Sequence, residues 1–159
     1  MKKKTKNITE LLIFIIGTEL VGSLSELLAG SRNIKEFYAG LIKPPFAPPG
    51  WLFPVAWGIL YALMASAAWL VWKCRHDKRD TALGLYFVQL AVNCLWTPVF
   101  FRLRSLGGAV AVILILTAIV TVMTVIFRRI DQRTTPLLAP YLLWLVYASY
   151  LTIGFSLLN

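Results

Sequence analysis

Two carboxylates inside an apolar stretch near the start of the chain are the first residues that could do chemistry. Glu19 and Glu26 lie seven residues apart, so on a helix they share one face. Carboxylates within a membrane are costly and are functional by default, and no Lys or Arg lies within an apolar stretch to pair with them. We expect these two groups to be protonated, to bond across helices or to line a wet cavity. A proton-coupled role and a place for Glu26 at the membrane surface also stay open.

A second candidate group is a polar and aromatic stripe that would follow one face of a helix. The stripe consists of Gln89, Asn93, Trp96 and Phe100. Residues three or four apart are neighbours on a helix surface, and amides and indoles should not face lipid. The stripe is therefore expected either to hydrogen-bond between helices or to line a ligand pocket.

Aromatic residues form two further stripes at helical spacing. These stripes are Phe53, Trp57 and Tyr61, and Trp144 with Ala148 one turn on. Such stripes are typical of a packed core or of an interfacial belt. Trp57, however, lies about two turns inside its apolar stretch, deeper than an interface anchor needs to be.

The sequence lacks the parts that most enzyme chemistry needs. Its single histidine, His76, lies in a charged connection, and no cluster of Cys, His and carboxylates could hold a metal. There is no Gly-rich nucleotide loop and no Ser-His-Asp set. Cys74 and Cys94 do not make a disulfide framework. No metal site and no required cofactor are expected.

Long apolar blocks must position these side chains. The chain has 159 residues, of which 58% are hydrophobic and 14% charged, whereas soluble domains have about 25% charged residues. Each block reaches the roughly 20 residues that cross a membrane, and backbone groups in lipid must be satisfied within the segment. The sequence predicts a single-domain, all-α integral membrane protein (1–159), a compact bundle of five transmembrane helices over residues 11–30, 51–72, 82–101, 106–127 and 135–157.

The connection over residues 31–50 is the one long loop, and loops of that length are usually functional or disordered. It contains KEFYAGLIK, which favours a short helical turn, and then the proline segment KPPFAPPGW at positions 43 to 51. Proline fixes φ and biases the preceding residue toward extended geometry, so such a loop loses little entropy on ordering. We expect this loop to act as a lid.

The positions of the charges set the expected orientation and partners. The net charge is +9, but all 16 Lys and Arg residues lie in tails and connections, which argues for a lipid bilayer and against nucleic acid. Eleven of them lie on the side of the N-terminus and five on the opposite side. The positive-inside rule then places the N-terminus in the cytoplasm and the C-terminus outside. Glu19 interrupts the first apolar run and no clear cleavage site follows, so we expect the first helix to be retained.

Three segments resemble the motifs of the tryptophan-rich sensory protein and translocator protein family, also called peripheral-type benzodiazepine receptors. The segments are LIKPPFAPPGWLFPVAWGILYAL, QLAVNCLWTPVFF and LLAPYLLWLVYASYL, within about residues 37 to 151 and with the family's order and spacing. The resemblance implies a five-helix membrane bundle, often a homodimer. It also implies a cavity near one membrane face that binds porphyrins, such as protoporphyrin IX, and hydrophobic drug-like ligands, with the first loop as its lid.

The resemblance also assigns roles to particular residues. Those expected at the ligand are Trp57 and Trp144 as the tryptophan pair, Phe53, Tyr61, Asn93, Trp96 and Ala148 on the helices, and Tyr38 and Pro48 on the loop. The family commonly has tryptophan where this chain has Phe46. Glu19 and Glu26 receive no role from the resemblance. For dimerisation the residues offer one small-xxx-small pair, Ala62 and Ser66.

Three functions stay open at this point. The first is a receptor or sensor that binds a hydrophobic small molecule, with movement of the ligand across or along the membrane as an extension. The second is an enzyme that degrades porphyrin with light and oxygen through Trp57 and Trp144. The third is a transporter or a structural membrane partner, which the lack of an internal repeat supports only weakly. Beyond the two indoles nothing indicates turnover, so binding is favoured over catalysis.

Overall fold

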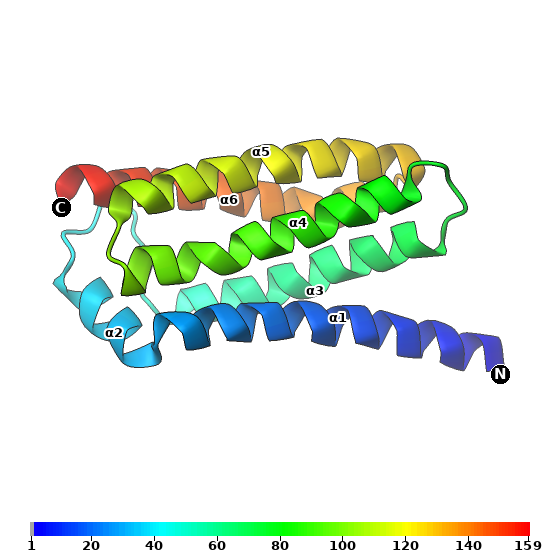
Figure 1. Ribbon diagram of the computed structural model, residues 1–159, viewed down its shortest axis with the longest axis horizontal. Helices are drawn as coiled ribbons and strands as arrows, with labels where there is room; N and C mark the ends of the chain where they lie inside the picture. The colour runs from blue at the N-terminus through cyan, green and yellow to red at the C-terminus, as the bar shows by residue number, and fades with distance from the viewer. Residues whose placement is uncertain (1) are drawn as a thin grey trace.

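The computed structural model describes residues 2–159 as a bundle of five long helices with a short helix at one end (Figure 1). The long helices are α1 (Lys2–Ala29), α3 (Leu52–Lys73), α4 (Arg79–Thr97), α5 (Leu106–Ile130) and α6 (Thr134–Leu158). At its end α4 passes into a π-helical turn, Pro98–Arg102. The predicted all-α bundle of five membrane-length helices is confirmed.

The helix bounds differ from the predicted ones mainly around the first connection. α1 begins at Lys2 rather than near residue 11, because the helix continues through the basic N-terminal segment. The connection itself contains α2 (Ser31–Gly40), ten residues long, where the sequence favoured only a short turn. Gly30 separates the two helices with φ at 80°, a left-handed conformation that glycine adopts without steric cost.

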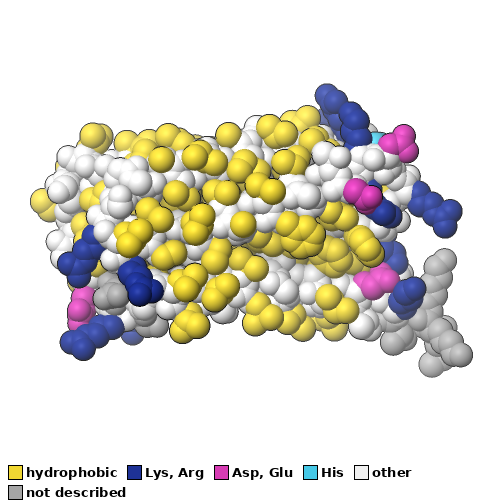
Figure 2. Space-filling model, viewed as in Figure 1, with side chains coloured by type: hydrophobic (Ala, Val, Ile, Leu, Met, Phe, Trp, Pro, Cys, Tyr) yellow, Lys and Arg dark blue, Asp and Glu magenta, His cyan; other side chains and the backbone are white. Residues whose placement is uncertain are grey.

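The surface of the bundle has the pattern of a membrane protein. Five helical segments of 22 to 25 residues are long and apolar enough to cross a bilayer. Figure 2 shows an apolar belt along the middle of one face, with Lys and Arg side chains gathered toward the two ends. This distribution matches an apolar slab bounded by water, and the chain is therefore a multi-pass integral membrane protein.

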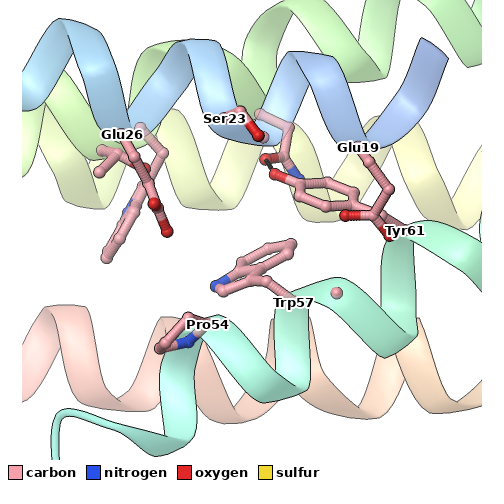
Figure 3. Close-up of a pocket in the computed structure, with 11 residues that line it drawn as sticks. Glu19, Ser23, Glu26, Pro54, Trp57 and Tyr61 are labelled. Atoms are coloured by element: carbon pink, nitrogen blue, oxygen red, sulfur yellow. Dashed lines mark hydrogen bonds between the residues drawn. The ribbon is translucent and has the colours of Figure 1, made fainter. Parts of the chain in front are cut away.

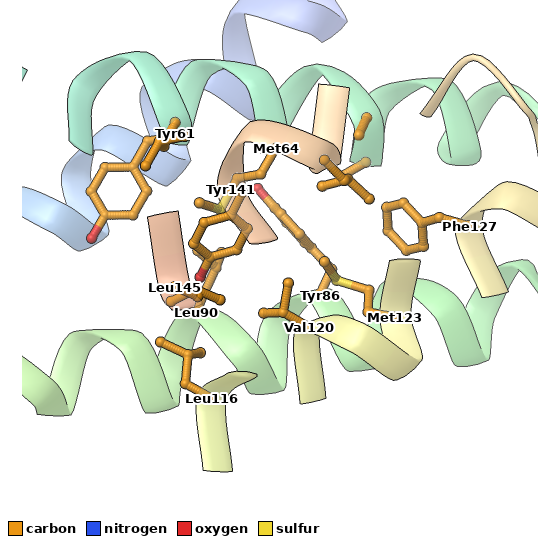
Figure 4. Packing of buried hydrophobic residues seen from close by; sticks show 14 of the residues in the cluster. Tyr61, Met64, Tyr86, Leu90, Leu116, Val120, Met123, Phe127, Tyr141 and Leu145 are labelled. Carbon is orange, nitrogen blue, oxygen red and sulfur yellow. The ribbon is translucent and has the colours of Figure 1, made fainter. Parts of the chain in front are cut away.

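The interior divides into two halves along the bundle axis. The distal half, near the N-terminus, is an apolar core whose central side chains are completely buried (Figure 4); they include Val120, Met123, Phe127 and Leu138. The lid half, at the end that carries α2, has a second cluster of buried residues, which are Phe100, Ala109, Leu151 and Phe155. Aromatic side chains from α2 and from the first turns of α3 pack against this second cluster.

α1 is the most peripheral of the long helices. Only 11% of its apolar stretch is buried, against 28 to 39% in the other four spans. Pro98 has no N–H and cannot bond to the Cys94 carbonyl four residues earlier, so this acceptor is free for the Ser25 hydroxyl of α1 at 2.8 Å. Two turns away, the hydroxyls of Thr18 and Tyr86 share a hydrogen bond. These two polar contacts attach α1 to α4.

Candidate functional site

A cavity of about 100 Å³ lies between α1, α3 and α4 in the lid half (Figure 3). Its lining residues are Glu19, Gly22, Ser23, Glu26, Pro54, Trp57, Gly58, Tyr61, Asn93, Trp96 and Thr97. In the close-up, the two carboxylates of α1 and the Trp57 ring of α3 lie on opposite sides of the same space. Pockets for drug-sized ligands measure roughly 300–1,000 Å³. The cavity as it stands would hold only part of such a ligand.

Gly22 sets how closely α1 approaches α3 at this cavity. A Cβ atom at this position would lie 2.2 Å from Cε2 of Tyr61, well inside contact distance. The backbone of α1 therefore rests directly on the tyrosine ring, which only glycine permits. Gly22 is not among the residues predicted from the sequence to form the site. The signal was present, because Gly22 shares a helical face with Glu19 and Glu26.

A chain of buried hydrogen bonds crosses the bundle beside the cavity. The Tyr61 hydroxyl donates to Oδ1 of Asn93 at 2.8 Å, and Nδ2 of Asn93 donates to the Tyr141 hydroxyl at 2.9 Å. The Tyr141 hydroxyl then donates to Oε1 of Gln89 at 2.9 Å. Of the two roles left open for the polar stripe, hydrogen bonding between helices is therefore present. Asn93 also lines the cavity and keeps a second amide hydrogen and a second lone pair for a ligand.

Aromatic rings connect this cavity to the lid. Tyr38 of α2 contacts Phe53 with ring centroids 5.7 Å apart, and Phe53 contacts Trp144 at 6.2 Å. Trp144 meets Trp57 nearly at right angles at 6.4 Å, and Trp57 lies 5.4 Å from Tyr61. These separations fall within the range in which aromatic pairs attract. The rings therefore form a continuous packed row from Tyr38 to the cavity wall.

Two indole groups at this site have buried N–H donors without a partner. Among the described residues, the buried side-chain polar atoms that lack a hydrogen bond are Trp69 Nε1, Trp96 Nε1, Thr135 Oγ1 and Trp144 Nε1. Trp96 lines the cavity, and Trp144 touches the cavity residue Trp57. An unsatisfied buried donor costs about 1–3 kcal/mol. The two indoles are therefore donors that an acceptor on a ligand could satisfy.

A hydrogen bond within the first connection joins α2 to the proline segment. The Tyr38 hydroxyl donates to the carbonyl of Pro48 at 2.7 Å, and Pro48 is buried. Burial, with a smaller contribution from the nearby Tyr147, raises the pKa of Tyr38 above its ordinary value, so the hydroxyl stays protonated as the donor. The ammonium group of Lys43 lies 4.7 Å from the centroid of the same ring.

The lid segment, residues 42–48, is attached to the outer face of α6. The hydroxyl of Tyr147 donates to the Phe46 carbonyl at 2.7 Å, and that of Tyr150 donates to the Pro45 carbonyl at 2.9 Å. Phe46 has φ at 62°, outside the ordinary range for a residue with a Cβ atom, and its side chain is 88% exposed. The Phe46 ring thus lies outside the cavity lining.

The C-terminal end of α6 supplies two more contacts to the lid segment. The side chain of Asn159 accepts from the Ile42 N–H at 2.8 Å and donates to the Ile42 carbonyl at 3.0 Å. A Cβ atom at Gly154 would lie 2.7 Å from Cβ of Pro44, so glycine allows the proline to rest on the helix. The C-terminal half of α6 and the residue that follows it therefore contact the lid segment at several points.

The structure brings only part of the predicted site residues to the cavity. Four line it, and they are Trp57, Tyr61, Asn93 and Trp96. The other five lie outside its lining, and they are Tyr38, Pro48, Phe53, Trp144 and Ala148. Ala148 is buried in the main core, one turn after Trp144 on α6. Glu19 and Glu26, for which lining a cavity was one of the roles left open by the sequence, both line it.

Comparison with known proteins gives consistent similarities over most of the chain. Residues 11–158 match the model of the TspO/MBR family. The chain is 38% identical to the translocator protein of Homo sapiens over 143 residues, which covers 86% of this chain and 84% of the relative. It is 32% identical to the tryptophan-rich protein TspO of Archaeoglobus fulgidus over 154 residues (96% and 99%) and 40% identical to protein CrtK of Rhodobacter capsulatus over 125 residues (77% and 78%).

Proposed function

The chain belongs to the TspO/MBR family of membrane sensors and receptors, and from this premise we propose that it binds porphyrins and other hydrophobic small molecules inside the bundle. The observation that carries the proposal is a cavity walled by Trp57, Tyr61 and Trp96 beside buried indole donors without partners. Aromatic walls with a few polar groups suit a flat, apolar ligand. Release of the ligand to the other side of the membrane would extend the same proposal to transport.

Ligand entry has to widen the cavity, because its present volume of about 100 Å³ is smaller than a porphyrin needs. Two elements are suited to move. α1 has the smallest share of buried residues among the five spans, and hydrogen bonds from Tyr147 and Tyr150 of α6 hold carbonyls of the lid segment. The structure thus corresponds to a closed form in this proposal, and the bound form has α1 or the lid displaced.

The experiment is a titration of protoporphyrin IX into the purified protein in nanodiscs, in the dark, followed by tryptophan fluorescence. We expect saturable quenching. Trp96→Phe keeps an aromatic ring but removes the unpartnered donor, so we expect an affinity lower by about fivefold. Trp51→Phe is the matched control, because Trp51 is 66% exposed and lies outside the cavity lining. Quenching that never saturates, or that both variants change equally, contradicts the proposal.

A second candidate function is light-dependent porphyrin degradation, and the contact between Trp57 and Trp144 favours its inclusion. In that case the porphyrin supplies the photochemistry, oxygen is the oxidant, and the protein positions the ring. The same titration under illumination tests it. A new product that disappears in Trp57→Phe and Trp144→Phe would support the enzyme. Saturable binding without product would support the receptor.

We also propose that the N-terminus lies in the cytoplasm and the lid outside, from the distribution of Lys and Arg. The test is labelling in sealed cells with a membrane-impermeant thiol reagent, in a background without native cysteines. Phe46→Cys on the exposed lid should be labelled, and Lys78→Cys in the connection between α3 and α4 should not. The reverse pattern would invert the proposed topology.

A further inference from the structure

The cavity is lined by two carboxyl side chains that form no ion pair within the described part of the chain. Glu19 is half-buried, Glu26 is exposed, and both line the cavity. Of the ion pairs in the described part of the chain, none includes either carboxylate, and no lining residue is basic. Two basic residues at this end contact other groups: Arg102 donates to the Leu28 carbonyl at 3.0 Å, and Arg32 pairs with Glu36 at 2.8 Å.

An ionised carboxylate inside a membrane span is unfavourable without a group that neutralises its charge, and both residues lie within the span Lys6–Ala29. Glu19 lies seven residues before Glu26 on α1, which places it roughly 10 Å further along the helix axis. Ionised side chains within a bilayer cost several kcal/mol unless they are paired, protonated or hydrated. A positive charge on a bound ligand would remove this cost, whereas a negative charge would increase it.

The opposite wall of the cavity is suited to the same kind of ligand. Trp57 presents its aromatic ring across from the two carboxylates, and the Tyr61 ring lies against α1 beside Glu19 (Figure 3). The faces of such rings attract ammonium and guanidinium groups, and tryptophan does so most strongly. Carboxylates on one side and aromatic faces on the other form a common arrangement for holding an organic cation.

We propose that the carboxylates of Glu19 and Glu26, with the Trp57 ring across the cavity and the Tyr61 ring beside Glu19, make this cavity select hydrophobic ligands that carry a cationic group, such as a protonated amine. This inference rests on the proposed function, because it concerns the ligand of the same cavity. It predicts that free propionates on a porphyrin weaken binding, since they bring negative charge toward two carboxylates.

Three forms of one macrocycle test the inference with ring size held constant. They are protoporphyrin IX with free propionates, its neutral dimethyl ester, and its bis(2-aminoethyl)amide with two ammonium groups. We expect the native protein in neutral-lipid nanodiscs to bind the diamine about five- to tenfold more tightly than the diacid in the dark, with the ester between them. In the double variant Glu19→Gln/Glu26→Gln, the ratio of the diacid Kd to the diamine Kd should fall to about one.

Two further variants serve as controls, one for the loss of any carboxylate and one for misfolding of the double variant. Glu36→Gln removes a carboxylate of α2 that is paired with Arg32 and lies outside the cavity lining, so it should leave the ratio unchanged. Should the double variant fail to fold, Glu26→Gln alone changes an exposed side chain and should lower the ratio by about half as much on a logarithmic scale.

The outcomes separate this inference from the function on which it rests. Saturable binding of all three macrocycles with a ratio that the glutamine variants leave unchanged would overturn the cationic selectivity and keep the receptor. Tighter binding of the diacid would also overturn it. A lack of saturable binding for every macrocycle would instead contradict the proposed function.

Discussion

The distal half and the lid half of the bundle are built from the same helices, yet their interiors are filled differently. In the distal half Val120, Met123 and Phe127 of α5 pack against Leu138 of α6 without remaining exposure. The lid half instead contains the cavity, two unpaired carboxylates and a lid residue with positive φ. Close packing gives a unique and stable structure, whereas incomplete packing leaves room for a ligand.

The contrast indicates how one short chain can combine a stable framework with a binding site. α4, α5 and α6 cross both halves. We infer that close packing in the distal half fixes the spacing of these helices, because packing around the cavity in the lid half is less complete. The element with the least burial, α1, forms the carboxylate wall of the cavity. We expect variants in the distal half to change the free energy of unfolding, and variants in the lid half to change ligand binding.

The largest effect is expected from Phe127→Ala in the distal half. Truncation of a completely buried phenylalanine should lower the free energy of unfolding by about 3–5 kcal/mol, through lost contacts and the resulting void. Thermal unfolding in detergent micelles measures the loss, and protoporphyrin affinity of the protein that remains folded should not change. Val125→Ala, on the same helix but half exposed to lipid, is the control. A loss of similar size in both would remove the distinction between the halves.

The second prediction concerns the approach of α1 to the cavity. Gly22→Ala should push α1 away from Tyr61 and lower the free energy of unfolding by about 1–3 kcal/mol, because the new methyl group overlaps the ring. Gly17→Ala, on the same helix with open space at its Cβ position, should be neutral or stabilising. Equal melting temperatures for both variants would show that α1 is free to move at no cost.

The third prediction concerns Asn93, which both lines the cavity and bonds between helices. Asn93→Leu should weaken ligand binding. It also leaves the Tyr61 hydroxyl without its acceptor and removes the N–H that donates to the Tyr141 hydroxyl, which keeps its bond to Gln89, so we expect a loss of about 1–3 kcal/mol of stability as well. Asn93→Asp, which keeps the acceptor for Tyr61, should separate the two effects. An unchanged melting temperature in Asn93→Leu would assign Asn93 to the ligand alone.

The smallest effect is expected at the lid. Tyr147→Phe and Tyr150→Phe each remove one hydrogen bond to the lid segment, worth about 0.5–1.5 kcal/mol. Because the bonds hold the closed form, ligand association and dissociation should both become faster while the melting temperature changes little. Stopped-flow fluorescence measures the two rates. Rates equal to those of the native protein would show that these bonds do not restrain the lid.

The sequence by itself determined the class of the protein, the number of spans and the aromatic stripes. Apolar runs of about 20 residues must become helices in lipid, because each backbone group has to be satisfied within its own segment. That requirement is local, so it can be derived without knowing how the helices meet. The same local rules marked Trp57, Asn93 and Trp96 as residues of interest through their spacing.

Only the tertiary structure decided which of these residues share a cavity. Ser25 meets the Cys94 carbonyl that Pro98 leaves free, and Gly22 brings α1 onto Tyr61, so Glu19 and Glu26 face the same space as Trp57. Trp144, which the resemblance predicts to contact the ligand, lies outside the cavity lining and packs against Trp57. The rotation and separation of packed helices depend on side chains distant in sequence. The spacing of Glu19 and Glu26 showed that they share a helical face, but only the folded bundle shows that this face lines the same cavity as Trp57.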